Sequence, residues 1–185
     1  KGLELRRVPL RTDPVTVELD PVDGVPMAFP AGQLTMLHAF GVGDVPISIS
    51  GDPTREGLLE HTIRNVGSVT GALVAAEPGT ILGVRGPFGT GWDVSDGMGG
   101  DVVFITGGIG LAPLRPAILE LHAHRATYNR VVRVHGARHP AAPPVGPERR
   151  PGACRAGRHP RAAAGTGPPT PPDRAPTSAL ATAGE

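Results

Sequence analysis

A glycine-rich stretch constrains the fold of this chain more than any other feature. It follows an apolar run at residues 101–105 and precedes a helix-like segment at residues 114–124. Glycines let a backbone approach a ligand closely, and the first N–H groups of a helix attract negative charge. The pattern predicts a strand, a tight turn and a helix that can hold a pyrophosphate. The residues of the stretch are Thr106, Gly107, Gly108, Ile109, Gly110, Leu111, Ala112 and Pro113.

The same stretch also fits a turn that binds no ligand. Pro113 stands where the full dinucleotide motif has a third glycine. Proline nevertheless suits the first turn of a helix, because its missing N–H is no loss there. The stretch alone leaves both alternatives open.

The composition excludes several classes of protein. The formal net charge of +1 gives no electrostatic attraction to nucleic acid or to an anionic membrane. A single cysteine excludes a disulfide framework and a cysteine-ligated metal cluster within the chain. The sequence has no apolar run of membrane-spanning length and no signal-peptide pattern at its start. We therefore expect a cytoplasmic protein without nucleic-acid or membrane partners.

Residues 1–97 contain short candidate strands separated by turn signals. Residues 15–19 alternate with a period close to two, as half-buried strands do, and Asp-Pro and Asp-Gly pairs follow them. Many short strands at close spacing favour a closed antiparallel β-barrel. The expected strands lie at residues 3–5, 15–19, 33–40, 45–50, 58–66 and 80–85, with a short helix at residues 68–76 and a loop at residues 86–89.

The pattern changes near Gly100. A strand at residues 102–106, the helix at 114–124 and a second strand at 130–135 make a βαβ unit. Its two strands should be parallel, with a right-handed crossover. Two strands and one helix form an incomplete sheet, whose outer edge has unpaired backbone groups.

Residues 139–185 consist mostly of Ala, Pro, Arg and Gly and show no helix or strand period. Such a segment buries too little apolar surface to offset its ordering entropy, so it is predicted to be disordered. A shifted reading frame of a GC-rich gene would give this composition, because these four residues have G- and C-rich codons. A genuine disordered extension is the alternative.

Six motifs follow one another along the chain. They are residues 29–33 (FPAGQ), 45–50 (VPISIS), 61–70 (HTIRNVGSVT), 83–89 (GVRGPFG), 107–116 (GGIGLAPLRP) and 136–138 (GAR). Each motif is weak alone, whereas the ordered set is specific. The set resembles the ferredoxin–NADP reductase superfamily. Within that superfamily it is most similar to the gamma subunits of cytoplasmic nickel–iron hydrogenases and sulfhydrogenases, and the electron-transfer subunit of dihydroorotate dehydrogenase is a near relative.

The resemblance implies an FAD-binding β-barrel of the ferredoxin reductase type at residues 1–97. A truncated α/β domain that binds NAD(P) would occupy residues 98–138, followed by the disordered tail at 139–185. The family's further strands, helices and cysteine cluster do not appear after residue 138.

The resemblance also implies where the cofactors bind. The Ser48 hydroxyl would contact FAD, Ile47 would pack against the isoalloxazine, and Arg64 would balance phosphate charge. The start of the short helix would receive the FAD pyrophosphate with its N–H groups and the Thr70 hydroxyl. The residues implied for FAD are Val45, Pro46, Ile47, Ser48, Thr62, Ile63, Arg64, Gly67, Val69 and Thr70. The stretch from Thr106 to Pro113 would hold NAD(P).

The chain departs from the wider superfamily at the first flavin motif. Many members have arginine and tyrosine where this chain has Val45 and Ile47. The phosphate contact of that arginine is therefore lost, and a plain buried strand is the alternative interpretation of residues 45–50.

The implied activity is flavin-dependent electron transfer between NAD(P)H and an iron–sulfur partner, in a hydrogenase-like complex. It needs no catalytic acid or base and no metal from this chain. Since no acidic residue follows the second expected strand, the choice between NAD and NADP stays open. The alternative is a catalytically inactive, flavin-binding remnant or interaction module.

Asp52, Glu56 and Glu60 are interpreted as a solvated loop face, and Trp92 either lies near the flavin or simply packs.

Overall fold

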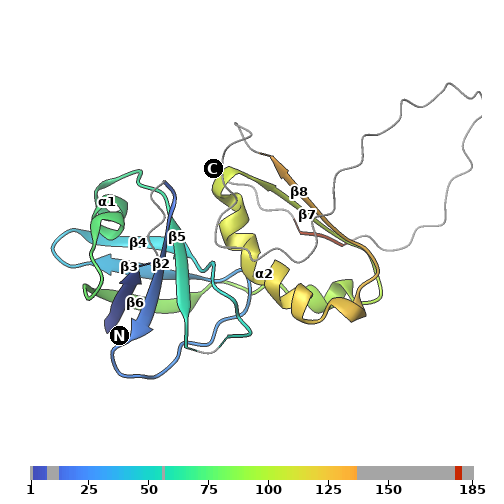
Figure 1. The fold of residues 1–185 in the computed structure, drawn as a ribbon, viewed down its shortest axis with the longest axis horizontal. Coiled ribbons are helices and arrows are strands. Elements are labelled where there is room, and N and C mark those ends of the chain that lie inside the picture. Colours follow the sequence, from blue (N-terminus) through green and yellow to red (C-terminus); the bar gives the residue numbers. More distant parts are fainter. Residues whose placement is uncertain (1, 8–12, 56, 137–177, 181–185) are drawn as a thin grey trace, which may run out of the picture.

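The computed structural model describes residues 2–7, 13–55, 57–136 and 178–180 of the chain. Figure 1 shows a β-barrel with one short helix, followed by a smaller α/β unit. The barrel elements are β1 (Gly2–Arg7), β2 (Val15–Pro21), β3 (Leu34–Ala39), β4 (Gly43–Ser48), β5 (Leu59–Ile63), α1 (Ser68–Ala75) and β6 (Ile81–Phe88).

The six barrel strands form one antiparallel sheet in the order β4-β3-β6-β1-β2-β5. An isolated antiparallel bridge joins Ile49, just after β4, to His61 on β5. The two edge strands therefore meet and the barrel is nearly closed, which confirms the predicted antiparallel β-barrel.

The barrel core follows from the alternation in the sequence. On β2 the side chains of Val15, Val17 and Leu19 are all buried and face the interior. Because successive side chains of a strand point to opposite faces, a period of two places the apolar set on one side. The core residues are Leu3, Val15, Val17, Leu19, Phe29, Leu37, Ala39, Ile49, Leu59, Ile63, Leu73, Leu82 and Val84.

Strand β6 is longer than the sequence predicted. It continues to Phe88, through residues expected to form a loop. The pairing between β3 and β6 shifts register between Leu34 and Met36, which marks a β-bulge. Gly86 has a φ of +133°, which L side chains rarely adopt, so glycine allows the strand to continue past the irregularity.

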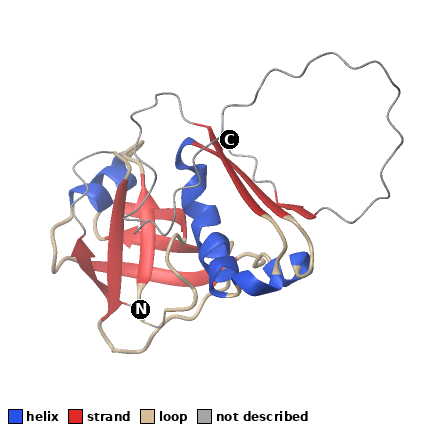
Figure 2. Ribbon diagram, turned by 45° about the vertical axis from the view of Figure 1, so that its right-hand side comes forward, coloured by secondary structure: helices blue, strands red, loops and turns tan. Residues whose placement is uncertain are grey.

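The second unit contains β7 (Val102–Gly107), α2 (Leu111–Ala123) and β8 (Val131–Gly136). Short 3₁₀ turns lie at Val94–Gly97, Gly108–Gly110 and Arg125–Thr127. Strands β7 and β8 are parallel, which confirms the predicted βαβ unit. Helix α2 lies between the barrel and this sheet (Figure 1 and Figure 2). No helix in the described part of the chain is both long and apolar enough to cross a membrane.

Helix α2 begins at Leu111, three residues before the predicted start at 114. Leu111, Leu114, Ile118 and Leu121 are buried against Phe104 in a second hydrophobic cluster. Their spacing of three to four residues gives the helix one apolar face, and packing of this face favours helix from its first residue.

A third strand, β9 (Ser178–Leu180), pairs in parallel with β7, so the sheet order is β8-β7-β9. The expected two-stranded sheet therefore has three strands. Ser178–Leu180 lies within the segment predicted to be disordered, and it pairs here because the free edge of β7 can accept a short extended segment. The other tail residues, 139–177 and 181–185, lie outside the described residues.

Candidate cofactor-binding site

The predicted glycine turn lies at the carboxyl end of β7, where the chain enters α2. Gly108 has a φ of +52°, so the backbone itself favours glycine there. Gly110 has an ordinary φ of −59°, and a Cβ added to it would meet no atom within 4 Å. Neither backbone conformation nor packing requires glycine at 110. A closely approaching ligand would explain why no side chain stands there.

The first turn of α2 contains no acidic residue, and no side chain caps it. Its leading N–H groups are therefore not opposed by negative charge, as a phosphate site requires. Two of the eight predicted residues serve packing instead, because Leu111 and Ala112 are buried in the second cluster. Thr106 is buried too, and its hydroxyl lies 2.7 Å from Nδ1 of His135, which ties the end of β7 to β8.

The first segment implied for FAD, residues 45–48, forms most of β4 at the edge of the barrel. Val45 and Ile47 are half-buried and pack against the barrel core, whereas Pro46 is exposed. Ser48 is half-buried, and its carbonyl oxygen lies 3.0 Å from Nδ1 of His61. The backbone of this segment is thus anchored from inside the barrel.

His61 was not among the residues predicted for the site. It is fully buried, and its Nε2 lies 3.1 Å from the Thr35 hydroxyl. Since a carbonyl only accepts hydrogen bonds, Nδ1 carries the proton and donates to Ser48, and Nε2 accepts from Thr35. Burial lowers the pKa of His61 to about 4, so the ring is neutral at physiological pH. Its position at the start of the motif at residues 61–70 was the signal available in the sequence.

The second segment implied for FAD, residues 62–64, has two buried side chains and one exposed side chain. The Thr62 hydroxyl is buried and lies 3.1 Å from that of Thr16, while Ile63 belongs to the barrel core. These two residues can offer a ligand only main-chain contacts. The Arg64 side chain is 45% exposed, and its Nε lies 4.0 Å from an Asp13 oxygen, so it can still reach a phosphate.

The turn before α1 is built by Thr70. Its hydroxyl accepts the N–H groups of Val66 at 3.0 Å and Gly67 at 2.9 Å, and donates to the Gly67 carbonyl at 3.1 Å. The hydroxyl expected to contact pyrophosphate is therefore already engaged within the chain. Gly67 has an extended φ of −168°, and a Cβ added there would meet no atom within 4 Å. The space above this turn is open, as it is above Gly110. Val69 is half-buried against the barrel core.

Two acidic residues of the expected loop face behave differently. Asp52 lies in a loop and accepts hydrogen bonds from the backbone and hydroxyl of Thr54, at 3.0 and 2.7 Å. Glu60 lies on β5, is 8% exposed and pairs with Arg115 of α2. The prediction of a solvated face is wrong at Glu60, because its partner comes from a distant part of the sequence. Glu56 lies outside the described residues.

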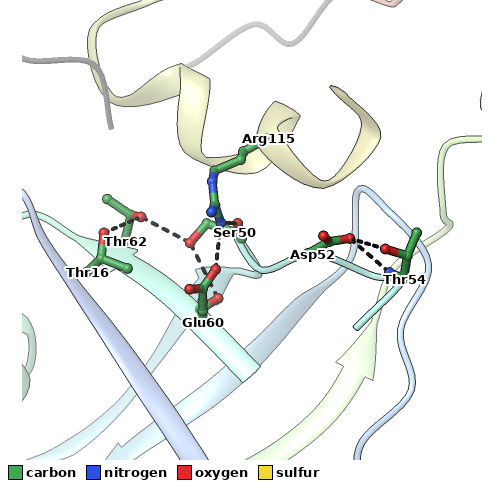
Figure 3. A network of polar contacts seen from close by, with 7 residues as sticks. All are labelled: Thr16, Ser50, Asp52, Thr54, Glu60, Thr62 and Arg115. Atoms are coloured by element: carbon green, nitrogen blue, oxygen red, sulfur yellow. Dashed lines mark hydrogen bonds and ion pairs between the residues drawn. The ribbon is translucent and has the colours of Figure 1, made fainter. Parts of the chain in front are cut away.

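Figure 3 shows how α2 meets the barrel at this ion pair. Arg115 Nη1 donates to the Ser50 carbonyl and to a Glu60 carboxylate oxygen, each at 2.5 Å. Ser50 follows Ser48 by two residues, and Glu60 precedes Thr62 by two residues. One guanidinium carried by α2 therefore contacts the barrel beside both predicted flavin segments.

Trp92 contributes to the same junction. Its backbone N–H donates to the Ala31 carbonyl at 2.8 Å, and its ring covers Gly32 so closely that an added Cβ would lie 2.7 Å from a ring carbon. Ala31 belongs to the second hydrophobic cluster, although it precedes β3 of the barrel. Trp92 therefore packs between barrel and α/β unit, as one of the two predicted alternatives states.

A nearly closed six-stranded antiparallel barrel, followed by an α/β unit with a glycine turn, defines a ferredoxin reductase-like fold. Phthalate dioxygenase reductase has this fold: the TM-score is 0.66 at 17% identity, over 77% of this chain and 45% of that chain. An NADH-dependent reduced ferredoxin–NADP oxidoreductase, studied for flavin-based electron bifurcation, matches with a TM-score of 0.60 at 27% identity, over 74% and 50% of the two chains.

Homologues of this chain are sulfhydrogenase gamma subunits and dihydroorotate dehydrogenase electron-transfer subunits, which confirms the predicted resemblance. Sulfhydrogenase 1 subunit gamma of Pyrococcus furiosus is 38% identical over 65% of this chain and 41% of its own length. A probable dihydroorotate dehydrogenase B (NAD(+)) electron-transfer subunit of Methanocella arvoryzae is 39% identical over 46% of this chain and 30% of its own length. The chain thus spans less than half the length of these curated relatives. No protein-family model matches it.

Proposed function

We propose that this chain is the FAD-binding part, with a portion of the NAD(P)-binding part, of a cytoplasmic electron-transfer subunit. It would pass electrons between NAD(P)H and an iron–sulfur partner in a hydrogenase-like complex. The observation that carries the proposal is the pair of open turns, at Gly67 and Gly110, which begin helices without acidic residues in their first turns. The relatives named sulfhydrogenase gamma subunit support the kind of complex.

The residues present fit two dinucleotides. Residues 45–48 and the main chain of 62–64 would lie along FAD, with its pyrophosphate at the Gly67 turn. The turn at residues 107–110 would receive the pyrophosphate of NAD(P). Bound FAD would accept hydride from NAD(P)H and release the two electrons singly, which is the chemistry that the cofactor brings to the site.

The side chains of this site would bind and orient rather than react. Val45 carries no charge where many relatives of the wider superfamily have arginine, so the exposed Arg64 is the proposed cation for phosphate. Ile47 offers an apolar surface beside the flavin ring, where it would exclude water. His61 would hold the carbonyl of Ser48 in place from inside the barrel.

The proposed domain boundaries fit the elements. Residue 97 ends the 3₁₀ turn Val94–Gly97, and residue 98 begins the connection to β7. Residue 138 follows β8 by two residues. Residues 98–138 would thus be one βαβ portion of the nicotinamide domain.

Binding of FAD by the purified full chain tests the proposal. We expect uptake of FAD with the yellow colour of bound flavin, measured by absorbance after gel filtration. Gly67→Val should fill the first turn and prevent retention of FAD, whereas Ala126→Val, at an exposed position of a 3₁₀ turn, should leave it unchanged. A wild-type chain that stays colourless with excess FAD would contradict the proposal.

An inactive flavin-binding remnant is the second candidate. It is favoured by the exposed side chains of Ile105 and Val134, 62% and 50% accessible, on the sheet face away from α2. A diaphorase assay with NADH, NADPH and an artificial acceptor separates the two. Turnover excludes the remnant, and FAD binding without turnover favours it.

A further inference from the structure

One ion pair joins the barrel to α2 in a largely buried place. The side chains of Arg115 and Glu60 are only 15% and 10% exposed. Arg115 sits on the second turn of α2 and points toward the barrel wall, away from the sheet that the apolar face of α2 covers (Figure 3). Nη1 of the guanidinium reaches two barrel groups, the Ser50 carbonyl oxygen and a Glu60 carboxylate oxygen.

The barrel side of this contact is held in place by its own hydrogen bonds. The Ser50 N–H donates to the Glu60 carbonyl at 2.8 Å, which fixes the two acceptors relative to each other. The Ser50 hydroxyl lies 3.0 Å from that of Thr62, and Thr62 is bonded in turn to Thr16 on β2. Arg115 therefore meets a rigid polar surface and not a mobile loop.

Stability alone does not account for this pair. Removing two charges from water costs as much as their attraction returns, so an apolar pair of similar volume often stabilises a protein equally well. In the described part of the chain Arg115 Nε is also buried without a hydrogen-bond partner, which adds to the cost. A hydrogen-bonded ion pair holds the two elements that it joins in one relative orientation, which an apolar contact does not.

We infer that Arg115 and Glu60 are positioning residues that fix the angle between α2 and the barrel. The angle matters because α2 starts at the glycine turn proposed for NAD(P), while Ser50 and Glu60 adjoin both segments proposed for FAD. The pair thereby sets how closely a bound nicotinamide approaches the flavin. The cofactors in this inference rest on the proposed function, whereas the fixed angle does not.

The test compares the full chain with the double variant R115M/E60L, which replaces the pair by apolar side chains. Arg125→Met is the matched control, since the Arg125 guanidinium donates to the nearby carbonyls of Tyr128 and Asn129 and takes no part in the Arg115–Glu60 pair. Trp92 is the only tryptophan and lies at the junction, so the decay of its fluorescence anisotropy reports motion between the two parts. Small-angle scattering of the same samples measures the spread of domain angles.

In the protein without flavin, we expect R115M/E60L to fold and to show faster local motion of Trp92 and a wider scattering profile than wild type. The affinity of the variant for FAD should stay within about twofold of wild type. Reduction of its bound flavin by NADH or NADPH, whichever reduces the wild type, should slow by about tenfold or more, because small misplacements of reactants are costly. The variant should lower kcat more than it raises KM. Arg115→Lys, which keeps Glu60 and a positive charge, should reduce the flavin faster than R115M/E60L does. Arg125→Met should match wild type in every measurement.

The inference is overturned if R115M/E60L keeps both the wild-type Trp92 anisotropy decay and the wild-type scattering profile. If the wild-type chain binds no FAD, the proposed function fails, and these two measurements still decide the inference on the protein without flavin. Should the double variant fail to fold, the nearly isosteric Glu60→Gln provides the same comparison. Wild-type behaviour of Glu60→Gln in every measurement would then overturn the inference.

Discussion

His61 Nδ1 lies 3.0 Å from the carbonyl oxygen of Ser48, so a buried histidine anchors the strand segment proposed to contact FAD. The second ring nitrogen is bonded to Thr35 on a different strand. Both nitrogens are thus used inside the barrel, and the ring connects β3, β4 and β5. We expect His61 to act on the stability of the barrel wall and through it on the cofactor segment.

The first prediction is that stability falls as pH drops from about 6.5 to 4. The unfolded chain has an ordinary histidine pKa of 6.5, and the folded chain lowers the pKa of His61 to about 4. Between these values the unfolded state binds more protons, so the neutral ring contributes stability above pH 6.5 that is lost toward pH 4. The full difference is about 3 kcal/mol. Urea unfolding, followed by circular dichroism at several pH values, measures it.

His61→Gln is the comparison for this first prediction. Glutamine does not titrate, so the variant should be less stable at pH 7 and should lose less stability between pH 6.5 and 4. Equal pH slopes for wild type and variant would show that other groups dominate acid unfolding.

The second prediction concerns the Arg115–Glu60 pair as a contribution to stability. Arg115→Met leaves a nearly buried carboxylate without its cation and should destabilise the chain by about 2–4 kcal/mol. The double variant R115M/E60L removes both charges and should be more stable than the single variant. Denaturant midpoints measure the order, and a double variant less stable than Arg115→Met would show that the pair itself is strongly stabilising.

The third prediction separates the two glycines of the predicted nicotinamide turn. Gly108→Ala forces an L side chain to φ +52° and should cost about 1–2 kcal/mol of stability. Gly110→Val meets open space and should leave stability nearly unchanged, yet it should abolish binding of NAD(P)H. Thermal melts and fluorescence titration with NADPH and NADH measure both effects. Unchanged nucleotide binding in Gly110→Val would favour the turn without a ligand.

The fourth prediction concerns the face of the small sheet that points away from α2. Ile105 and Val134 are opposite each other on β7 and β8 and are largely exposed. Parallel sheets are normally covered on both faces, so these side chains favour self-association. The double variant I105T/V134T should sediment as a smaller species than wild type, without loss of FAD binding. Identical sedimentation of the two proteins would show that this face does not mediate self-association.

The fifth prediction concerns residues 139–185. If their composition arises from a shifted reading frame, another frame of the gene beyond codon 138 should encode alternating strand patterns and a cysteine cluster. Reading the nucleotide sequence is sufficient. If no alternative frame restores those patterns, the segment is a genuine extension.

The sequence predicted the barrel and the βαβ unit because both depend on local patterns. Period-two alternation placed Val15, Val17 and Leu19 inside, and the glycine turn marked the start of α2. Glu60 was misjudged because its partner Arg115 is 55 residues away, and no local pattern encodes such a pairing. Strand β9 was missed for a similar reason, since a sheet edge selects its partner through backbone groups.

Anaerobic titration of the FAD-loaded full chain with NADH and, separately, NADPH asks whether the chain holds a flavin and a nicotinamide close enough for electron transfer. We expect the visible flavin absorption to bleach with about one equivalent of one of the two nucleotides, as a two-electron transfer requires. A chain that binds FAD but keeps that absorption under excess of both nucleotides would contradict it.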